Sequence, residues 1–176
     1  MRTRFVKTAI AALTCAMVAV PAGAAYAGSG PAPKPSERSI SKSTAPSAKG
    51  NPASRAAQAA DVCEDAYQIG STGYVKRSGV TIASVKQFYS PDCQENYGYV
   101  WVWESFRKTA GDYDVTSAIY SSTQDEVLGG RSWLNTTGQE FWSYGTDTVS
   151  DCTAAVGSVR KAGDPTPNHA ASSKRC

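Results

Sequence analysis

The sequence predicts a small all-β domain, a sandwich or barrel of about six or seven antiparallel strands that is stabilised by disulfides. Short runs of β-branched and aromatic residues recur roughly every ten residues and are separated by turn signals. After residue 60 the chain has only two leucines and no long stretch of helical periodicity, so little helix is expected. Four cysteines follow a secretory signal, which predicts two disulfides.

Residues 1–27 have the pattern of a bacterial secretory signal. A positively charged start precedes the apolar run 8–20, and a small-x-small cleavage site ends at Ala27. The apolar run is short for a membrane span, so no transmembrane segment is expected after the signal is removed. We therefore expect a mature protein that begins near Gly28 and is secreted, either extracellular or associated with the cell wall.

Residues 28–60 are expected to be a disordered basic linker. Ile40 is the only large aliphatic residue in this segment and aromatic residues are absent, so it cannot bury enough apolar surface to offset its ordering entropy. Its net charge is +4, whereas residues 61–176 carry ten basic and fourteen acidic side chains. Because the folded part is acidic and has no recognised binding motif, no nucleic-acid partner is expected.

The β domain is expected over residues 61–176, with a loose polar tail over residues 164–175. A short helical turn is compatible with residues 57–66. Strands are predicted at residues 73–77, 80–89, 97–108, 113–122, 126–134, 139–144 and 152–160. Ser78-Gly79 predicts the turn of a hairpin, and Gly129-Gly130 predicts a bulge or a tight turn.

The cysteines of the mature chain are Cys63, Cys93, Cys152 and Cys176, since Cys15 belongs to the signal. Three pairings are possible, and we favour Cys63 with Cys93 and Cys152 with Cys176 because each bond then closes a moderate local loop. Zinc binding would call for paired C-x-x-C spacings or histidines. No metal site and no cofactor are therefore expected.

Residues 89–93 carry a short motif, Tyr89-Ser90-Pro91-Asp92-Cys93, which ends an extended run and is followed by a tryptophan. With Cys63 upstream, this pattern resembles a small uncharacterised family of secreted or membrane-tethered domains from high-GC Gram-positive bacteria with a Y-S-P-x-C motif. The resemblance covers Cys63 to Trp103. It implies a secreted β module and no particular activity, because the family has none assigned.

Residues 97–103 form the sharpest candidate binding site. Because side chains alternate along a strand, one face carries Tyr97, Tyr99, Trp101 and Trp103, and the other carries Gly98, Val100 and Val102. Two interpretations stay open. Another part of the molecule buries the four rings, or the rings form an exposed platform that stacks on sugars or docks a partner protein.

Catalytic residues are poorly represented in the sequence. His169 is the only histidine and lies in the predicted tail, and no G-x-S-x-G elbow occurs. We therefore expect a secreted, non-catalytic binding or interaction module for cell-envelope polysaccharide or an extracellular protein. One alternative is a secreted protease inhibitor that presents residues 125–131 or 107–109 as an exposed loop. A further alternative is a hydrolase with two carboxylates placed across a cleft.

Overall fold

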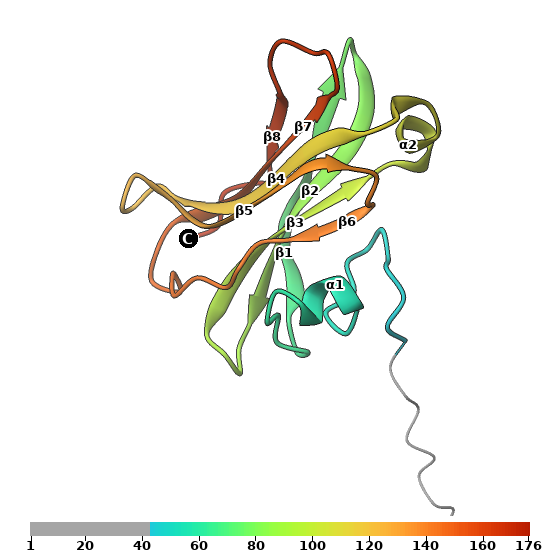
Figure 1. The fold of residues 1–176 in the computed structure, drawn as a ribbon. Helices are drawn as coiled ribbons and strands as arrows, with labels where there is room; N and C mark the ends of the chain where they lie inside the picture. Colours follow the sequence, from blue (N-terminus) through green and yellow to red (C-terminus); the bar gives the residue numbers. More distant parts are fainter. Residues whose placement is uncertain (1–42) are drawn as a thin grey trace, which may run out of the picture. The chain divides into compact units, whose positions relative to one another are not determined.

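The computed structural model describes residues 43–176, and it confirms the all-β prediction (Figure 1). Eight strands form two antiparallel sheets of four strands, in the orders β1-β2-β3-β6 and β5-β4-β7-β8. The elements are α1 Arg55–Gln58, β1 Tyr67–Arg77, β2 Val80–Ser90, β3 Glu95–Val102, α2 Glu104–Ala110, β4 Tyr113–Ser121, β5 Glu126–Thr136, β6 Glu140–Trp142, β7 Thr153–Lys161 and β8 Asn168–Ala171. The two sheets form a sandwich around a shared core.

The turn and the bulge predicted from glycine positions are both confirmed. Ser78 and Gly79 join β1 to β2 with φ angles of 49° and 80°, the left-handed pair that suits a two-residue hairpin. In β5, the register with β4 shifts between Ser117 and Ile119, opposite Gly129, whose φ is 61°.

The inter-sheet core is built from one face of each sheet. β-branched side chains dominate it, among them Val75, Val85, Val100, Val115, Ile119 and Val159, with Phe141 from β6. Each of these side chains is buried, so they interlock the two layers as the period-two pattern requires.

The predicted strand 97–108 is wrong beyond Val102. Residues 104–110 form helix α2, which buries Phe106 and Ala110 against the inter-sheet core. These two residues are four positions apart and share one helix face. The apolar side chains at 102 and 106 also fit an alternating strand, so the short helix is hidden in the sequence pattern.

The predicted loose tail is also wrong. Residues 168–171 form β8, which pairs with β7, and Arg175 bridges to Thr153 through two backbone hydrogen bonds of 2.7 Å. Ser172 is buried and its hydroxyl accepts a hydrogen bond from the backbone N–H of Ala155. Backbone pairing, rather than apolar side chains, orders this segment.

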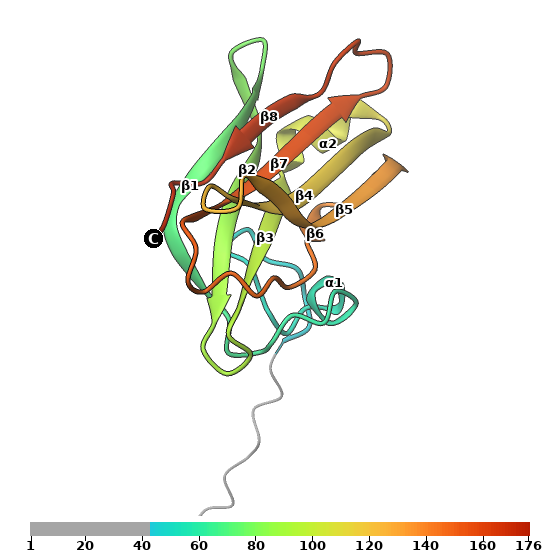
Figure 2. The same cartoon turned by 90° about the vertical axis from the view of Figure 1, so that its left-hand side faces the viewer.

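Residues 43–66, here called the N-terminal cover, pack on the outer face of the sheet β1-β2-β3-β6 (Figure 2). The expected disorder of residues 28–60 is therefore wrong for residues 43–60. Ser54 caps α1 by accepting a hydrogen bond from the backbone N–H of Ala57, and alanines at 53, 57 and 60 are buried. The predicted signal and residues 28–42 of the predicted linker lie outside the described residues.

Both favoured disulfides are confirmed. Cys63 is bonded to Cys93, which ties the cover to the β2–β3 turn, and Cys152 is bonded to Cys176, which ties the chain end to β7. Each is expected to stabilise the fold by roughly 2–4 kcal/mol. In residues 43–176, neither helix has the length or the apolar composition to cross a membrane.

The motif at residues 89–93 closes the β2–β3 turn. The Ser90 hydroxyl donates to the Asp65 carboxylate at 2.5 Å and accepts from the backbone N–H of Cys93 at 3.0 Å. The backbone N–H of Asp92 donates to the same carboxylate at 2.9 Å. These bonds place Cys93 where Cys63 reaches it, which gives the motif a structural role.

Candidate functional site

The structure divides the four aromatic residues of the candidate site into two pairs. Tyr97 and Tyr99 are 0% exposed, whereas Trp101 is half-buried and Trp103 is 38% exposed. All four lie on the outer face of their sheet, as the alternation predicts, but the N-terminal cover lies over only part of that face. The covered part is core, and the open part is the candidate site.

The covered part is an aromatic cluster of Phe88, Tyr97, Tyr99 and Trp142. The ring centroids of Tyr99 and Trp142 are 4.5 Å apart, and those of Phe88 and Trp142 are 4.8 Å apart. Small residues of the cover pack against these rings. A Cβ atom at Gly50, whose φ is 88°, would lie 2.2 Å from the Phe88 ring, so glycine is required there.

The open part is a groove of about 510 Å³, here called the aromatic groove. Its lining residues are Ala48, Thr72, Tyr74, Ser84, Lys86, Trp101, Trp103, Glu104, Ser105 and Gln139. They come from the cover, β1, β2, β3, α2 and the chain before β6. The groove therefore combines three aromatic rings with hydroxyl, amide and charged groups, a combination typical of small-ligand sites.

Trp103 is held in place by both its backbone and its ring. Its backbone N–H donates to the carbonyl oxygen of Ile82 at 2.9 Å, which extends the β2–β3 pairing by one residue before α2 begins. Its indole Nε1–H donates to the Ser84 hydroxyl at 2.8 Å. Tyr74, which is 52% exposed, meets the Trp103 ring edge to face at 6.2 Å. The two rings therefore present a preformed aromatic wall.

The cover contributes Ala48 to the lining of the groove. The Lys86 ammonium donates to the carbonyl oxygen of Ala48 at 2.7 Å, and the Tyr99 hydroxyl donates to the carbonyl oxygen of Ser47 at 2.5 Å. Burial lowers the pKa of Lys86, and the nearby charge of Lys49 lowers it further. Burial raises the pKa of the Tyr99 phenol beyond its usual range, so this group stays a neutral donor.

Glu140 interacts with the cover. Its carboxylate accepts a hydrogen bond from the indole N–H of Trp142 at 3.2 Å, and hydrogen-bonding contributions from Ser54, Asn51 and Ser47 of the cover also favour its charged form. Burial raises the pKa of Glu140, while these hydrogen bonds act to lower it. This carboxylate thus connects β6 with the cover.

Glu104 is the one carboxylate among the described residues that line the groove. The Arg107 guanidinium is 2.7 Å from the Glu104 carboxylate, and Gln139 Nε2 is 3.5 Å from it. This pairing offsets the negative charge at that end of the groove.

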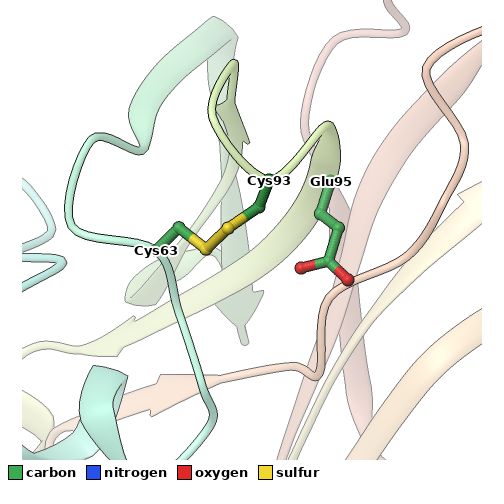
Figure 3. Close-up of side chains that lie close together, drawn as sticks. All are labelled: Cys63, Cys93 and Glu95. Atoms are coloured by element: carbon green, nitrogen blue, oxygen red, sulfur yellow. A yellow bond between two sulfur atoms is a disulfide. The ribbon is translucent and has the colours of Figure 1, made fainter.

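A second candidate site is a group of three side chains of the types that bind metals. Figure 3 shows Cys63 and Cys93 close to the Glu95 carboxylate, a grouping of metal-ligating residue types. The two sulfurs are bonded to each other, and a disulfide provides no thiolate for a metal. Glu95 instead accepts a hydrogen bond from the Tyr97 hydroxyl at 2.6 Å.

A second hollow, of about 740 Å³, lies on the outer face of the sheet β5-β4-β7-β8. Small residues such as Ala118, Gly130 and Ser132 form most of its lining, and His169 lies at its β8 side. The Arg131 guanidinium stacks between the rings of Trp133 and Tyr144, with distances of 5.0 and 4.8 Å to the ring centroids. Unlike the aromatic groove, the hollow has no aromatic side chain of Phe, Tyr or Trp in the part of its lining that the structure describes.

The two segments considered as inhibitory loops are not loops. Residues 126–131 lie within β5, and residues 107–109 lie within α2. A protease-binding loop must fit an active-site cleft in extended form, and neither a paired strand nor a helix does so.

Of the groove-lining residues, only Trp101 and Trp103 were predicted as binding residues, and the aromatic Tyr74 and the buried Lys86 were missed. Tyr74 lies opposite Ser84 only because the β1–β2 register shifts between Val75 and Lys76. The period of two does place Lys86 on the same face as Ser84, so the position of Lys86 could have been predicted from the strand expected at residues 80–89.

Comparison with protein-family models, curated proteins and solved structures found no match. The resemblance of residues 89–93 to a known family stays a prediction.

Proposed function

We propose that this protein is a secreted, non-catalytic binding module whose aromatic groove holds the sugar rings of a cell-envelope polysaccharide. The observation that carries this proposal is the open wall made by Tyr74, Trp101 and Trp103 next to hydroxyl and amide groups. A sugar ring has an apolar face of C–H groups and a rim of hydroxyls. Aromatic rings match the face, and polar side chains match the rim.

Extracellular placement is part of the proposal. Two disulfides are compatible with an oxidising compartment, and residues 1–27 have the pattern of a secretory signal. The single carboxylate of the groove favours binding over hydrolysis, because a glycosidase places two carboxylates across its cleft.

The test is retention of purified protein on insoluble cell-wall material, with Tyr74→Ala and Trp101→Ala beside the parent. Both variants are expected to lose retention by about tenfold or more, because central aromatic anchors carry most of a binding energy. Tyr67→Ala is the matched control, since Tyr67 also lies on β1 and is 51% exposed but lies outside the groove.

Equal retention of all three variants and the parent would contradict the groove as the binding site. Retention of the parent on an immobilised extracellular protein, but on none of the wall glycans, would replace the polysaccharide with a protein partner.

A further inference from the structure

Lys86 lines the aromatic groove and is the best-buried charged residue of that lining. The residue is only 9% exposed, and its ammonium makes one hydrogen bond, to the carbonyl oxygen of Ala48. An ammonium carries three N–H donors, so two donors remain for other partners. Within residues 43–176, Lys86 forms no ion pair with a carboxylate.

A buried cation without a counter-ion is costly, because the protein gives back little of the hydration energy that the charge loses. The cost is visible in the lowered pKa of Lys86, to which burial contributes most and Lys49 contributes next. Residues kept at such a cost in a groove are frequently binding residues.

The charges around Lys86 do not compensate it. Lys49 adds a second positive charge nearby. Glu104, at the α2 end of the groove, is already paired with Arg107 at 2.7 Å. The open groove therefore has an unmatched positive charge next to its aromatic wall.

We infer that Lys86 binds an anionic group, a carboxylate or a phosphate, on the glycan that the aromatic groove holds. This inference rests on the proposed function and adds the ligand class: an acidic rather than a neutral polysaccharide. The aromatic rings hold the sugar ring, and the Lys86 ammonium forms a charge-assisted hydrogen bond with the anion beside it. The bound anion replaces the missing counter-ion, so ligand binding also relieves the cost of the buried charge.

The experiment measures binding of the full mature protein to three soluble polymers by titration calorimetry. Polygalacturonate carries sugar carboxylates, its methyl ester has the same sugars without the charge, and poly(N-acetylglucosamine 1-phosphate) carries phosphates between its sugar rings. The parent is expected to bind at least one anionic polymer on the order of tenfold more tightly than the neutral ester. Which anionic polymer binds distinguishes a carboxylate from a phosphate source.

Variants assign the preference to Lys86. Lys86→Met is expected to remove the preference, Lys86→Arg to keep most of it, and Lys76→Met, which removes an exposed lysine of β1, to leave it unchanged. Thermal melts of each variant show whether it is folded. If Lys86→Met does not fold, Lys49→Met is used in its place and is expected to weaken the preference.

Each outcome decides the inference. Equal binding of acid and ester, or binding of the ester alone, overturns the anion inference while the proposed glycan function stands. A preference that survives in folded Lys86→Met also overturns it. Binding to none of the three polymers overturns the anion inference, and together with no retention on cell-wall material it overturns both proposals.

Discussion

The Tyr99 hydroxyl donates a hydrogen bond to the carbonyl oxygen of Ser47 at 2.5 Å, across 52 residues of sequence. This bond joins β3 to the N-terminal cover, as does the bond from the Cys63 backbone N–H to the Tyr97 hydroxyl at 3.4 Å. The cover acts as a third layer over part of one face of the sheet, which explains why a strand with two apolar faces occurs in a two-layer sandwich.

Tyr99→Phe tests this bond. The variant keeps the ring and leaves the Ser47 carbonyl without its donor, so the free energy of unfolding is expected to fall by about 1–2 kcal/mol. Urea denaturation measures the change. Tyr67→Phe is the control and is expected to have no measurable effect, because Tyr67 is exposed on β1. A Tyr99→Phe variant as stable as the parent would show that the hydroxyl does not hold the cover.

The Cys63–Cys93 disulfide is expected to keep the cover on the sheet. Replacing both cysteines with serine should cost roughly 2–4 kcal/mol and is expected to speed cleavage by trypsin after Arg55, because the cover then opens more often. Peptide mapping after brief proteolysis measures the cleavage. The matched variant, with serine at Cys152 and Cys176, is expected to leave cleavage after Arg55 as slow as in the parent, and faster cleavage in both variants would contradict a local role for Cys63–Cys93.

Alanine variants of two tryptophans test which part of the outer sheet face is buried core and which part is open groove. Trp142→Ala removes a ring that is 0% exposed and is expected to cost about 3–5 kcal/mol. Trp103→Ala removes a ring at the open wall and is expected to cost about 1–2 kcal/mol, partly from the lost hydrogen bond to Ser84. Thermal melts of the two variants rank them. A larger loss of stability in Trp103→Ala than in Trp142→Ala would contradict the assignment of Trp142 to the core and of Trp103 to the open groove.

The raised pKa of Glu140 predicts a pH dependence of stability. Its folded pKa lies above its ordinary value of 4.5, so the folded state binds the proton more tightly than the unfolded state does. The stabilising contribution is therefore fully present below about pH 4 and is lost as the pH rises through the folded pKa.

Unfolding free energies of the parent and Glu140→Gln, measured at about pH 4 and about pH 8, isolate this contribution from that of the other carboxylates. We expect the stability of the parent relative to the variant to fall as the pH rises. A rise would mean that the hydrogen bonds to Glu140 outweigh its burial.

Local patterns predicted much of the fold. Alternation placed β2 and β4 within one residue at each end, Ser78-Gly79 marked the first hairpin, and loop length favoured the observed cysteine pairs. These features depend on neighbours in sequence or on chain connectivity. The faces of Tyr97, Tyr99, Trp101 and Trp103 followed from the same rule, but their burial did not, because it depends on a segment about fifty residues away.

That segment was misjudged because its own composition is poor in apolar side chains. The sheet contributes the apolar surface, from Phe88, Tyr99 and Trp142, and the cover contributes residues small enough to lie on the rings, such as Gly50 and Ala57. Composition rules count apolar residues within one segment, so they cannot detect a segment that uses the apolar surface of its partner. The tail was missed for a related reason, because β8 is held mainly by backbone pairing.

The N-terminal cover also determines where the protein can be shortened. A shorter protein that begins at Asp61 would retain the chain near Cys63 but would lose α1 and the residues that lie on the aromatic cluster. Uncovering four aromatic side chains of roughly 150–250 Å² each would create a larger apolar patch than soluble monomers usually tolerate. Such a protein is expected to self-associate and precipitate, so an affinity tag or fusion partner should be joined ahead of Ser43.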